Sequence, residues 1–288
     1  MMAKKLLSVF LFLFLIQHIK AQIFEGAEAD RKLPGSEILR LNETTGKIKY
    51  ALLGNTLVIT KEQTLPYLSK VLGFSSLYNL QLTKEEHDEL GFDHLRFQQT
   101  FNNVPILGGI VIAHIKNNRL HSFNGEVFDV NEKSNTTLLT ENSCLAKVIE
   151  TVGAISYKWQ FKEEEELIKI IKDDKNATWF PKGDLMFCPK NLDFDNPQFS
   201  LTYKFTIHAQ EPLLGENIYV SAINGSIIAR ENLLHTTDVP GKAITKYSGT
   251  RNIITDSINP NKLASLYSSF GYDYERTIVA ATNVQKPI

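Results

Sequence analysis

Two predicted strands and the turn between them meet in the stretch His94-Leu95-Arg96-Phe97-Gln98-Gln99-Thr100-Phe101-Asn102-Asn103-Val104-Pro105-Ile106-Leu107-Gly108-Gly109. Its first eight residues mostly alternate between polar and apolar side chains, which predicts a half-buried β-strand over 94–101. Asn102 to Pro105 interrupts that strand, because asparagine and proline favour turns. The near-continuous apolar run over 107–115 then predicts a central strand that is covered on both faces.

The residues around this stretch complete a small module. Asn117-Asn118 reads as a turn, and a third strand is expected over 119–128. Before the strands, leucines at helical spacing predict an amphipathic helix over 64–72, with Gly73 suited to its C-terminal end. We therefore expect antiparallel strands packed beside a helix.

A second module of the same kind follows. Apolar residues at helical spacing predict a helix over 143–159. The run Glu163-Glu164-Glu165-Glu166 reads as a solvated charged surface without a ligand. Strict alternation predicts a strand over 199–207, and Asn224-Gly225 predicts a two-residue type I′ hairpin turn. Strands are expected on either side of that turn, over 219–223 and 226–231. The expected fold class is α+β, built as two successive modules.

The N-terminus has the order of a secretory signal peptide. Lys4 and Lys5 precede an apolar run over 6–16, and cleavage is expected between Ala21 and Gln22. The run is shorter than the roughly 20 apolar residues that span a bilayer, although a short membrane anchor is the alternative. The protein is therefore expected to be secreted, with no membrane association once the signal is removed.

Composition narrows the class of partner. The chain has 288 residues and a formal net charge of −1, from 31 Lys and Arg against 32 Asp and Glu. Nucleic-acid binding usually needs a basic excess, so no nucleic-acid partner is expected. The two cysteines, Cys144 and Cys188, rule out a disulfide-dense scaffold. They either form one disulfide or stay as buried thiols, and we favour buried thiols.

Catalytic signatures are missing from the sequence. It contains no His-Glu-x-x-His, no Gly-x-Ser-x-Gly and no phosphate-binding glycine loop. We therefore expect no enzymatic activity, no catalytic residue, no metal ligand and no cofactor in this chain. His114 and His121 flank a hairpin turn and could face each other across two strands, either as metal ligands or as ordinary hydrogen-bonding surface histidines.

These strands resemble a known module. The stretch from His94 to Gly109, followed by His114 and by Asn124-Gly125, is similar to the prodomain module of fungalysin and thermolysin precursors. That family pattern runs His-x-Arg-(aromatic)-x-Gln-x-(aromatic)-x-Gly-Val-Pro-Val, then a strand that ends in His, then Asn-Gly. Asn103 stands where the family usually has Gly, and Ile106 stands where it usually has Val.

The rest of the chain extends the resemblance. Leu201 to Phe205, Tyr219 to Ala222 and Asn224-Gly225 are similar to the PepSY-type module that follows in those precursors, although Ser221 stands where Asp is commoner. Gly241 to Thr250 is similar to the first strand of the mature thermolysin-like domain. The resemblance covers about residues 62–257.

The resemblance implies a zymogen propeptide that helps a zinc metalloendopeptidase to fold and blocks its cleft until processing. The implied partner is a thermolysin-like protease domain, in cis or in trans; zinc and calcium would belong to that domain. Processing is expected in a polar linker that contains His235, Asp238 and Gly241. The motif residues, which serve either the interface or the module's own strands, are His94, Arg96, Gln99, Pro105, Gly108, His114, Asn124 and Gly125.

The predicted organisation has six segments. These are a signal peptide (1–21), a leader (22–61), a fungalysin/thermolysin propeptide-like module (62–130), a PepSY-like module (131–235), a linker with the first-strand stub of a catalytic domain (236–257) and a divergent tail (258–288). We hypothesise that a frameshift between Ser257 and Asp273 truncated a full precursor, because a shifted reading frame can spell family-like text from Asp273 onward. The nucleotide sequence tests this hypothesis, which fails if the shifted frame does not open into a His-Glu-x-x-His region.

Two alternatives to a truncated precursor remain. The chain is either a standalone inhibitor or chaperone that acts on a metalloprotease in trans, or an exported binding protein unrelated to proteolysis, since fold alone does not determine function.

Overall fold

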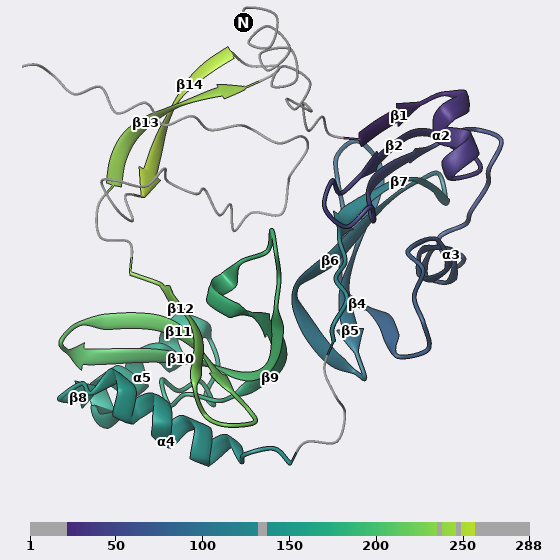
Figure 1. Cartoon of the computed structure of the whole chain (residues 1–288). Coiled ribbons are helices and arrows are strands. Elements are labelled where there is room, and N and C mark those ends of the chain that lie inside the picture. The colour runs from purple at the N-terminus through teal and green to yellow at the C-terminus, as the bar shows by residue number, and fades with distance from the viewer. Residues whose placement is uncertain (1–21, 132–136, 235–237, 246–248, 257–288) are drawn as a thin grey trace, which may run out of the picture. The chain divides into compact units, whose positions relative to one another are not determined.

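The computed structural model describes residues 22–131, 137–234, 238–245 and 249–256 (Figure 1). The predicted signal peptide, His235 and the tail from 257 onward lie outside the described residues. The chain forms two compact units. The first contains Met1–Val148, Gly183–Lys204 and Tyr219–Ala229, and the second contains Ile149–Lys182, Phe205–Ile218 and Arg230–Ile288. The module boundaries at 62, 131 and 236 stay predictions.

An antiparallel sheet is the main feature of the first unit (Figure 1). Its strands follow the order β1-β2-β3-β7-β6, and β5 pairs with both β6 and β4. The bounds are β1 Gln22–Glu25, β2 Ser36–Leu41, β3 Ile48–Leu53, β4 Tyr78–His87, β5 Phe92–Phe101, β6 Val104–Lys116 and β7 Arg119–Glu126. The strands expected over 94–101, 107–115 and 119–128 are thereby confirmed as β5, β6 and β7.

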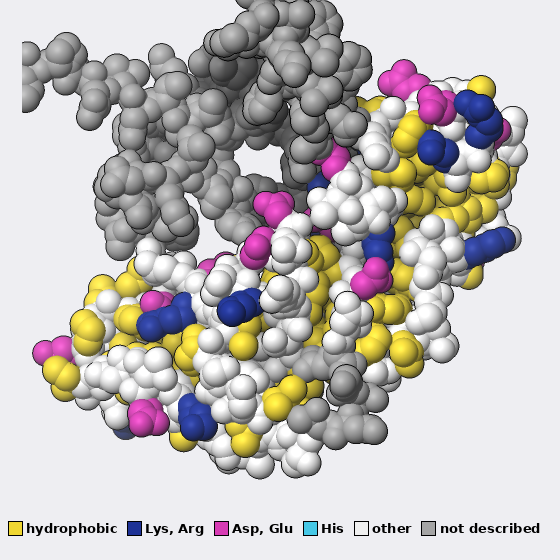
Figure 2. All heavy atoms as spheres, viewed as in Figure 1, with side chains coloured by type: hydrophobic (Ala, Val, Ile, Leu, Met, Phe, Trp, Pro, Cys, Tyr) yellow, Lys and Arg dark blue, Asp and Glu magenta, His cyan; other side chains and the backbone are white. Residues whose placement is uncertain are grey.

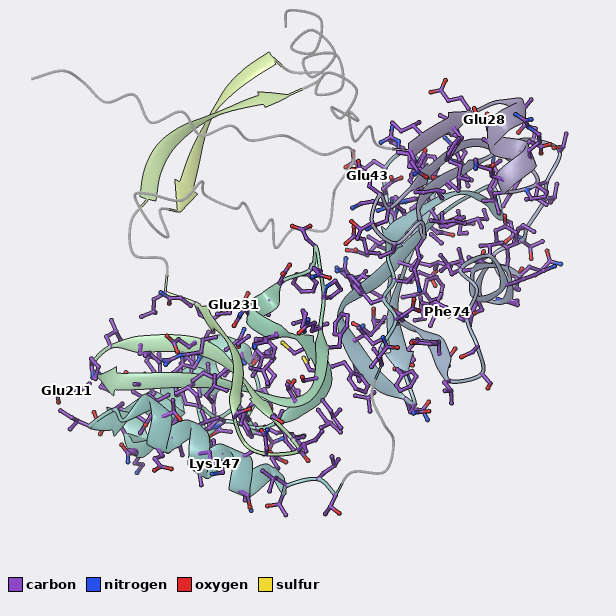
Figure 3. The ribbon with its side chains drawn as sticks, viewed as in Figure 1. Glu28, Glu43, Phe74, Lys147, Glu211 and Glu231 are labelled. Atoms are coloured by element: carbon purple, nitrogen blue, oxygen red, sulfur yellow. The ribbon has the colours of Figure 1, made fainter. Side chains whose placement is uncertain are left out.

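Two helices accompany this sheet, α2 (Ala27–Lys32) and α3 (Thr64–Val71). The helix expected over 64–72 is confirmed as α3. Leu68 of α3 is fully buried and packs into a core with Leu80 of β4 and Phe97 of β5. Phe74, labelled in Figure 3, follows α3 and packs against the same core. Burying this apolar face is the main force that holds helix and sheet together.

The remaining helices and strands are shared between the two units. The helices are α4 (Glu141–Val152) and α5 (Lys162–Lys172), and the short 3₁₀ turns are η1 (Lys158–Gln160) and η2 (Lys190–Leu192). The strands are β8 Ser156–Tyr157, β9 Asp184–Pro189, β10 Phe199–Glu211, β11 Leu214–Ser221 and β12 Ile227–Asn232. They follow the order β9-β10-β11-β12, with β8 beside β10. The α+β class is confirmed, and none of the described helices is long and apolar enough to cross a membrane.

The boundaries of one predicted helix need correction. The helix expected over 143–159 begins at Glu141 and ends at Val152. Gly153 then adopts a φ of +60°, and the amide of Ile155 donates to the carbonyl of Glu211, which turns the chain into β8. The glutamate run 163–166, which was read as a solvated charged surface, lies in α5. Glu163, Glu164 and Glu165 are in its first turn, where the positive end of the helix dipole stabilises carboxylates.

The predicted type I′ turn at Asn224-Gly225 is wrong. Gly225 has a φ of +73°, but Asn224 is not among the residues with positive φ. The turn is longer: the amide of Ser221 donates to the carbonyl of Ser226, and the Ser221 hydroxyl accepts from the amides of Ile223 and Asn224. Lys147 on α4, labelled in Figure 3, packs over Gly225. Ser221 therefore stabilises a wider loop.

The two-residue turns with positive φ occur instead at the Asn-Asn pairs. Asn102 and Asn103 have φ values of 49° and 65°, and Asn117 and Asn118 have values of 51° and 56°. Asparagine tolerates this left-handed region better than most residues, which suits it to tight hairpins. Each pair joins neighbouring antiparallel strands of the first unit, β5 to β6 and β6 to β7.

The region expected to be a linker with one strand contains two strands. β13 (Asp238–Thr245) pairs antiparallel with β14 (Gly249–Asp256). Asp238 and Gly241, which were assigned to the processing linker, lie on β13. The expected open linker is therefore replaced by a hairpin from Asp238 onward.

Candidate functional site

A chain of hydrogen bonds links four polar side chains of β5, β6, β7 and the β4–β5 turn. Asp88 Oδ2 lies 3.0 Å from His94 Nε2, and His94 Nδ1 lies 2.7 Å from His114 Nδ1. His114 Nε2 lies 2.7 Å from Asn124 Oδ1. Both histidines are only 8% exposed. Three predicted motif residues thus meet in one buried network, which we call the His94–His114 network.

A bulge in β6 brings the two histidines together. Thr100 pairs with Pro105 next to the hairpin turn, and a hairpin that continued without interruption would place Val111 opposite His94. The register shifts between Gln98 and Thr100, so His114 faces His94 instead. Because each strand alternates its faces, paired residues point to the same side of the sheet.

Gln98 and Gly108 build this bulge. The side-chain amide of Gln98 donates to the carbonyls of Gln99, Ile106 and Gly109, at 2.9, 2.8 and 3.0 Å. Gly108 has a φ of +79°, and a Cβ there would lie 2.6 Å from the ring of Phe194. Glycine is therefore required at 108 by both backbone and packing.

The prediction that His114 and His121 face each other across two strands is wrong. His114 pairs with Ser122, and the register shifts before Ile115 pairs with Leu120, so His121 is the extra residue of a second bulge. Its ring lies edge-on to Phe92, at 5.4 Å, and Phe92 stacks on His94 at 6.1 Å. Among the residues that the structure describes, no three His, Cys, Asp or Glu side chains gather as a metal site.

The hydrogen bonds determine where the protons of the network lie. The Asp88 carboxylate and Asn124 Oδ1 only accept, so Nε2 of each histidine donates to its oxygen partner. The two Nδ1 atoms then share one proton.

The electrostatics agree with this arrangement. Burial lowers the pKa of His114, which favours its neutral form, in spite of an opposing hydrogen bond to Asn124. Hydrogen bonds from the amide of Phe92 and from His94 lower the pKa of Asp88, which favours its carboxylate form. The carboxylate form of Asp88 is the form that accepts the hydrogen bond from His94 Nε2.

A second polar anchor joins β5 to the segment after β7. Gln99 is fully buried; its Oε1 accepts from the amide of Phe128 at 2.9 Å, and its Nε2 donates to the carbonyl of Phe128 at 2.8 Å. The side chain thus replaces a backbone partner for Phe128. Phe128 and Val130 in turn pack into an aromatic core with Phe101 and Phe187.

The other predicted motif residues have structural positions. Pro105 lies near the start of β6, and Gly125 has a φ of +152° in close contact with Ile110. Arg96 pairs with Lys84 and Ile112 across the sheet, and none of its described hydrogen bonds joins the His94–His114 network. Asp88, Gln98 and Phe92 were missed by the sequence analysis, because their roles depend on strand register.

Both cysteines are free buried thiols, as favoured from the sequence. The thiol of Cys144 points at the carbonyl of Ser221, and burial raises the pKa of that thiol. A raised pKa keeps Cys144 protonated and poorly reactive at neutral pH.

Comparison with known proteins relates part of the first unit to protease propeptides. Residues 78–127, from β4 to just past β7, match the family model described as the Fungalysin/Thermolysin Propeptide Motif. All four residues of the His94–His114 network lie within that match.

Curated relatives extend the similarity beyond the motif. The chain is 23% identical over 206 residues to thermolysin of Alicyclobacillus acidocaldarius subsp. acidocaldarius, covering 70% of the chain and 35% of the relative. It is 27% identical over 188 residues to bacillolysin of Bacillus amyloliquefaciens, covering 64% and 33%. The chain thus spans about a third of the length of these relatives. Among solved structures, the Bacillus megaterium YpeB C-terminal domain aligns over 77% of this chain and 93% of its own, with 14% identity and a TM-score of 0.29.

Proposed function

We propose that this chain is the propeptide region of a secreted thermolysin-like zinc metalloendopeptidase, which assists the folding of the protease domain and blocks its active site until processing. The observation that supports this most is the motif match over 78–127, which coincides with strands β4 to β7. The similarity to thermolysin over 206 residues agrees with it.

The chemistry of the described residues suits a binding role. The polar groups of the motif are used within the fold: Gln99 anchors Phe128, and His94 and His114 bond to each other. The sequence contains no His-Glu-x-x-His, so zinc binding and peptide hydrolysis are assigned to the protease domain. On the face that Figure 2 displays, Lys and Arg are interspersed with Asp and Glu, without the basic stripe of a nucleic-acid-binding surface.

Export and processing belong to the same proposal. Signal cleavage between Ala21 and Gln22 would release the chain outside the cell, where thermolysin-like proteases act. Separation from the protease domain is proposed near residues 235–241. On this hypothesis cleavage there follows opening of the β13–β14 hairpin, because proteases need an extended and accessible backbone.

Inhibition in trans tests the proposed function. The purified chain is expected to inhibit a thermolysin-like enzyme in a dose-dependent way and to raise the yield of enzyme refolded from denaturant. Initial rates on a peptide substrate and recovered activity after refolding are the measurements. A serine protease of unrelated fold serves as the control enzyme and should not respond.

The outcomes separate the alternatives. Inhibition together with improved refolding supports a propeptide, acting in cis or in trans. If neither effect is seen with a folded chain, the proposal is wrong and an exported binding protein is favoured. Chelator-sensitive proteolysis by the purified chain itself would contradict the assignment of catalysis to a separate domain.

A further inference from the structure

We propose that the His94–His114 pair is an acid-sensitive latch that holds β5 against β6 while it carries one shared proton and weakens that contact when it takes up a second. The proposal concerns the stability of this chain. It starts from the 2.7 Å distance between the two Nδ1 atoms and from the burial of both rings.

The distance selects a proton as the group between the rings. A zinc ion binds histidine nitrogen at about 2.0–2.1 Å in tetrahedral geometry, which separates two such nitrogens by roughly 3.3 Å. The observed 2.7 Å is shorter than that separation and is typical of a strong hydrogen bond. The outer nitrogens already donate to Asp88 and Asn124, so both inner nitrogens are left to share one hydrogen.

A second proton removes this bond. Uptake at His114 would leave both Nδ1 atoms as N–H donors that face each other, so the hydrogen bond is lost and the two donors repel each other. Because both rings are nearly excluded from water, that repulsion is poorly screened. The stability of the contact between β5 and β6 thus depends on the protonation state of the network.

The charged and titratable groups around the pair compensate only in part for the uptake of a second proton. Asp88 in the β4–β5 turn accepts from His94 Nε2, and its negative charge partly opposes the lowering of the pKa of His114. Glu86 pairs with His94 across β4 and β5 but forms an ion pair with Lys84. His121 on β7 acts in the opposite direction and lowers the pKa of His114. Lys116 at the end of β6 lies over the Phe92 ring. Within the network, the Asp88 carboxylate bonds to His94, whereas His114 bonds to the amide oxygen of Asn124.

The direction in which the pKa of His114 is shifted determines the pH range in which the latch weakens. The pKa of folded His114 lies below its ordinary value of 6.5, so unfolding takes up a proton when the pH falls below that value. The stabilisation is complete above about pH 6.5 and is lost as the pH falls towards the folded pKa. Acid therefore weakens the first unit in a range where most carboxylates are still charged.

His114→Gln tests the latch. Glutamine offers an acceptor oxygen to His94 Nδ1 and a donor amide to Asn124 Oδ1, so it reproduces the hydrogen bonds of neutral His114 and does not titrate. Urea unfolding of the full chain is followed by far-ultraviolet circular dichroism at about pH 7.5 and pH 5. H114Q is expected to lose about half or more of the fall in urea midpoint that the wild type shows.

A matched control lies in the same sheet. His87 is exposed and contacts Asp93, so His87→Gln should keep the full acid-dependent fall. If H114Q falls as much as the wild type, or H87Q removes the fall equally well, the latch is wrong. Should H114Q fail to fold, nitrogen-15 NMR of the wild-type imidazoles decides: one shared proton at neutral pH and a second uptake below pH 6.5 support the latch, whereas a second uptake at or above 6.5 overturns it.

A consequence for inhibition rests on the proposed function. If the chain inhibits a protease, wild-type inhibition should weaken between neutral and acid pH more than inhibition by H114Q. The unfolding experiment needs no protease, so failure of the latch and failure of the propeptide assignment are observed separately.

Discussion

Replacing Gly125 with alanine is expected to unfold the first unit or to destabilise it by about 3 kcal/mol or more. Gly125 lies on β7 opposite Val111 of β6 and has a φ of +152°. A Cβ at this position would lie 2.1 Å from the carbonyl oxygen of Ile110 and 2.8 Å from the Cα of Val111. Both atoms belong to the backbone, so the two strands would have to separate.

The experiment compares Gly125→Ala with Gly46→Ala. Gly46 has a positive φ of 68°, but a Cβ there meets nothing within 4 Å. Its substitution isolates the backbone strain, about 1–2 kcal/mol, from the steric clash. Both tryptophans, Trp159 and Trp179, belong to the second unit, so circular dichroism and amide hydrogen exchange of β6 and β7 are the suitable measurements. Equal destabilisation by the two variants would contradict the clash.

Replacing Gln99 with leucine is expected to cost about 2–5 kcal/mol, although the two side chains are similar in size. Gln99 is fully buried and provides both hydrogen bonds of the Phe128 backbone. Leucine would leave a buried amide and a buried carbonyl without these partners, and each unpaired group costs about 1–3 kcal/mol. The loss should appear as a lower urea midpoint at constant slope.

Gln81→Leu is the matched control for Gln99→Leu. Gln81 lies on β4 of the same sheet, is exposed, and pairs with Gln98 across the strands. Its substitution should change the free energy of unfolding by no more than about 0.5 kcal/mol. If Gln99→Leu is equally mild, Phe128 finds other hydrogen-bond partners and the anchor assigned to Gln99 is wrong.

Local patterns predicted α3, β5, β6 and β7 of the first unit, whereas α2 and strands β1 to β4 were not predicted. Alternation identified β5, the apolar run identified β6, and leucine spacing identified α3, because each signal lies within one element. Asn117-Asn118 was correctly placed in a turn, since asparagine tolerates positive φ. The errors occurred where groups far apart in the sequence determine the local backbone conformation. Ser221 widened the turn at Asn224-Gly225, and the pairing of Ile155 with Glu211 followed the early end of α4.

The motif residues were recognised one by one from the sequence, but their arrangement was not. His94, His114 and Asn124 were named as family positions, whereas Asp88 and Gln98 were not singled out as site residues. Nothing in the spacing of His94 and His114 indicates that they bond, because regular pairing from the Asn102-Asn103 turn would oppose His94 to Val111. His121 does not face His114, because the second bulge, between β6 and β7, makes His121 the extra residue.

The sequence alone predicted strands β5, β6 and β7, the asparagine turns and the resemblance to a propeptide module, since these depend on near neighbours along the chain. Only the tertiary structure decided the register between β5 and β6. Gln98 donates hydrogen bonds to carbonyls of the bulge, and Gly108 has a left-handed backbone there. Together they shift the register of β6 against β5, and this shift places two buried imidazoles 2.7 Å apart. A shared proton is a property of that contact, and such a contact arises from packing and strand register between segments far apart in the sequence.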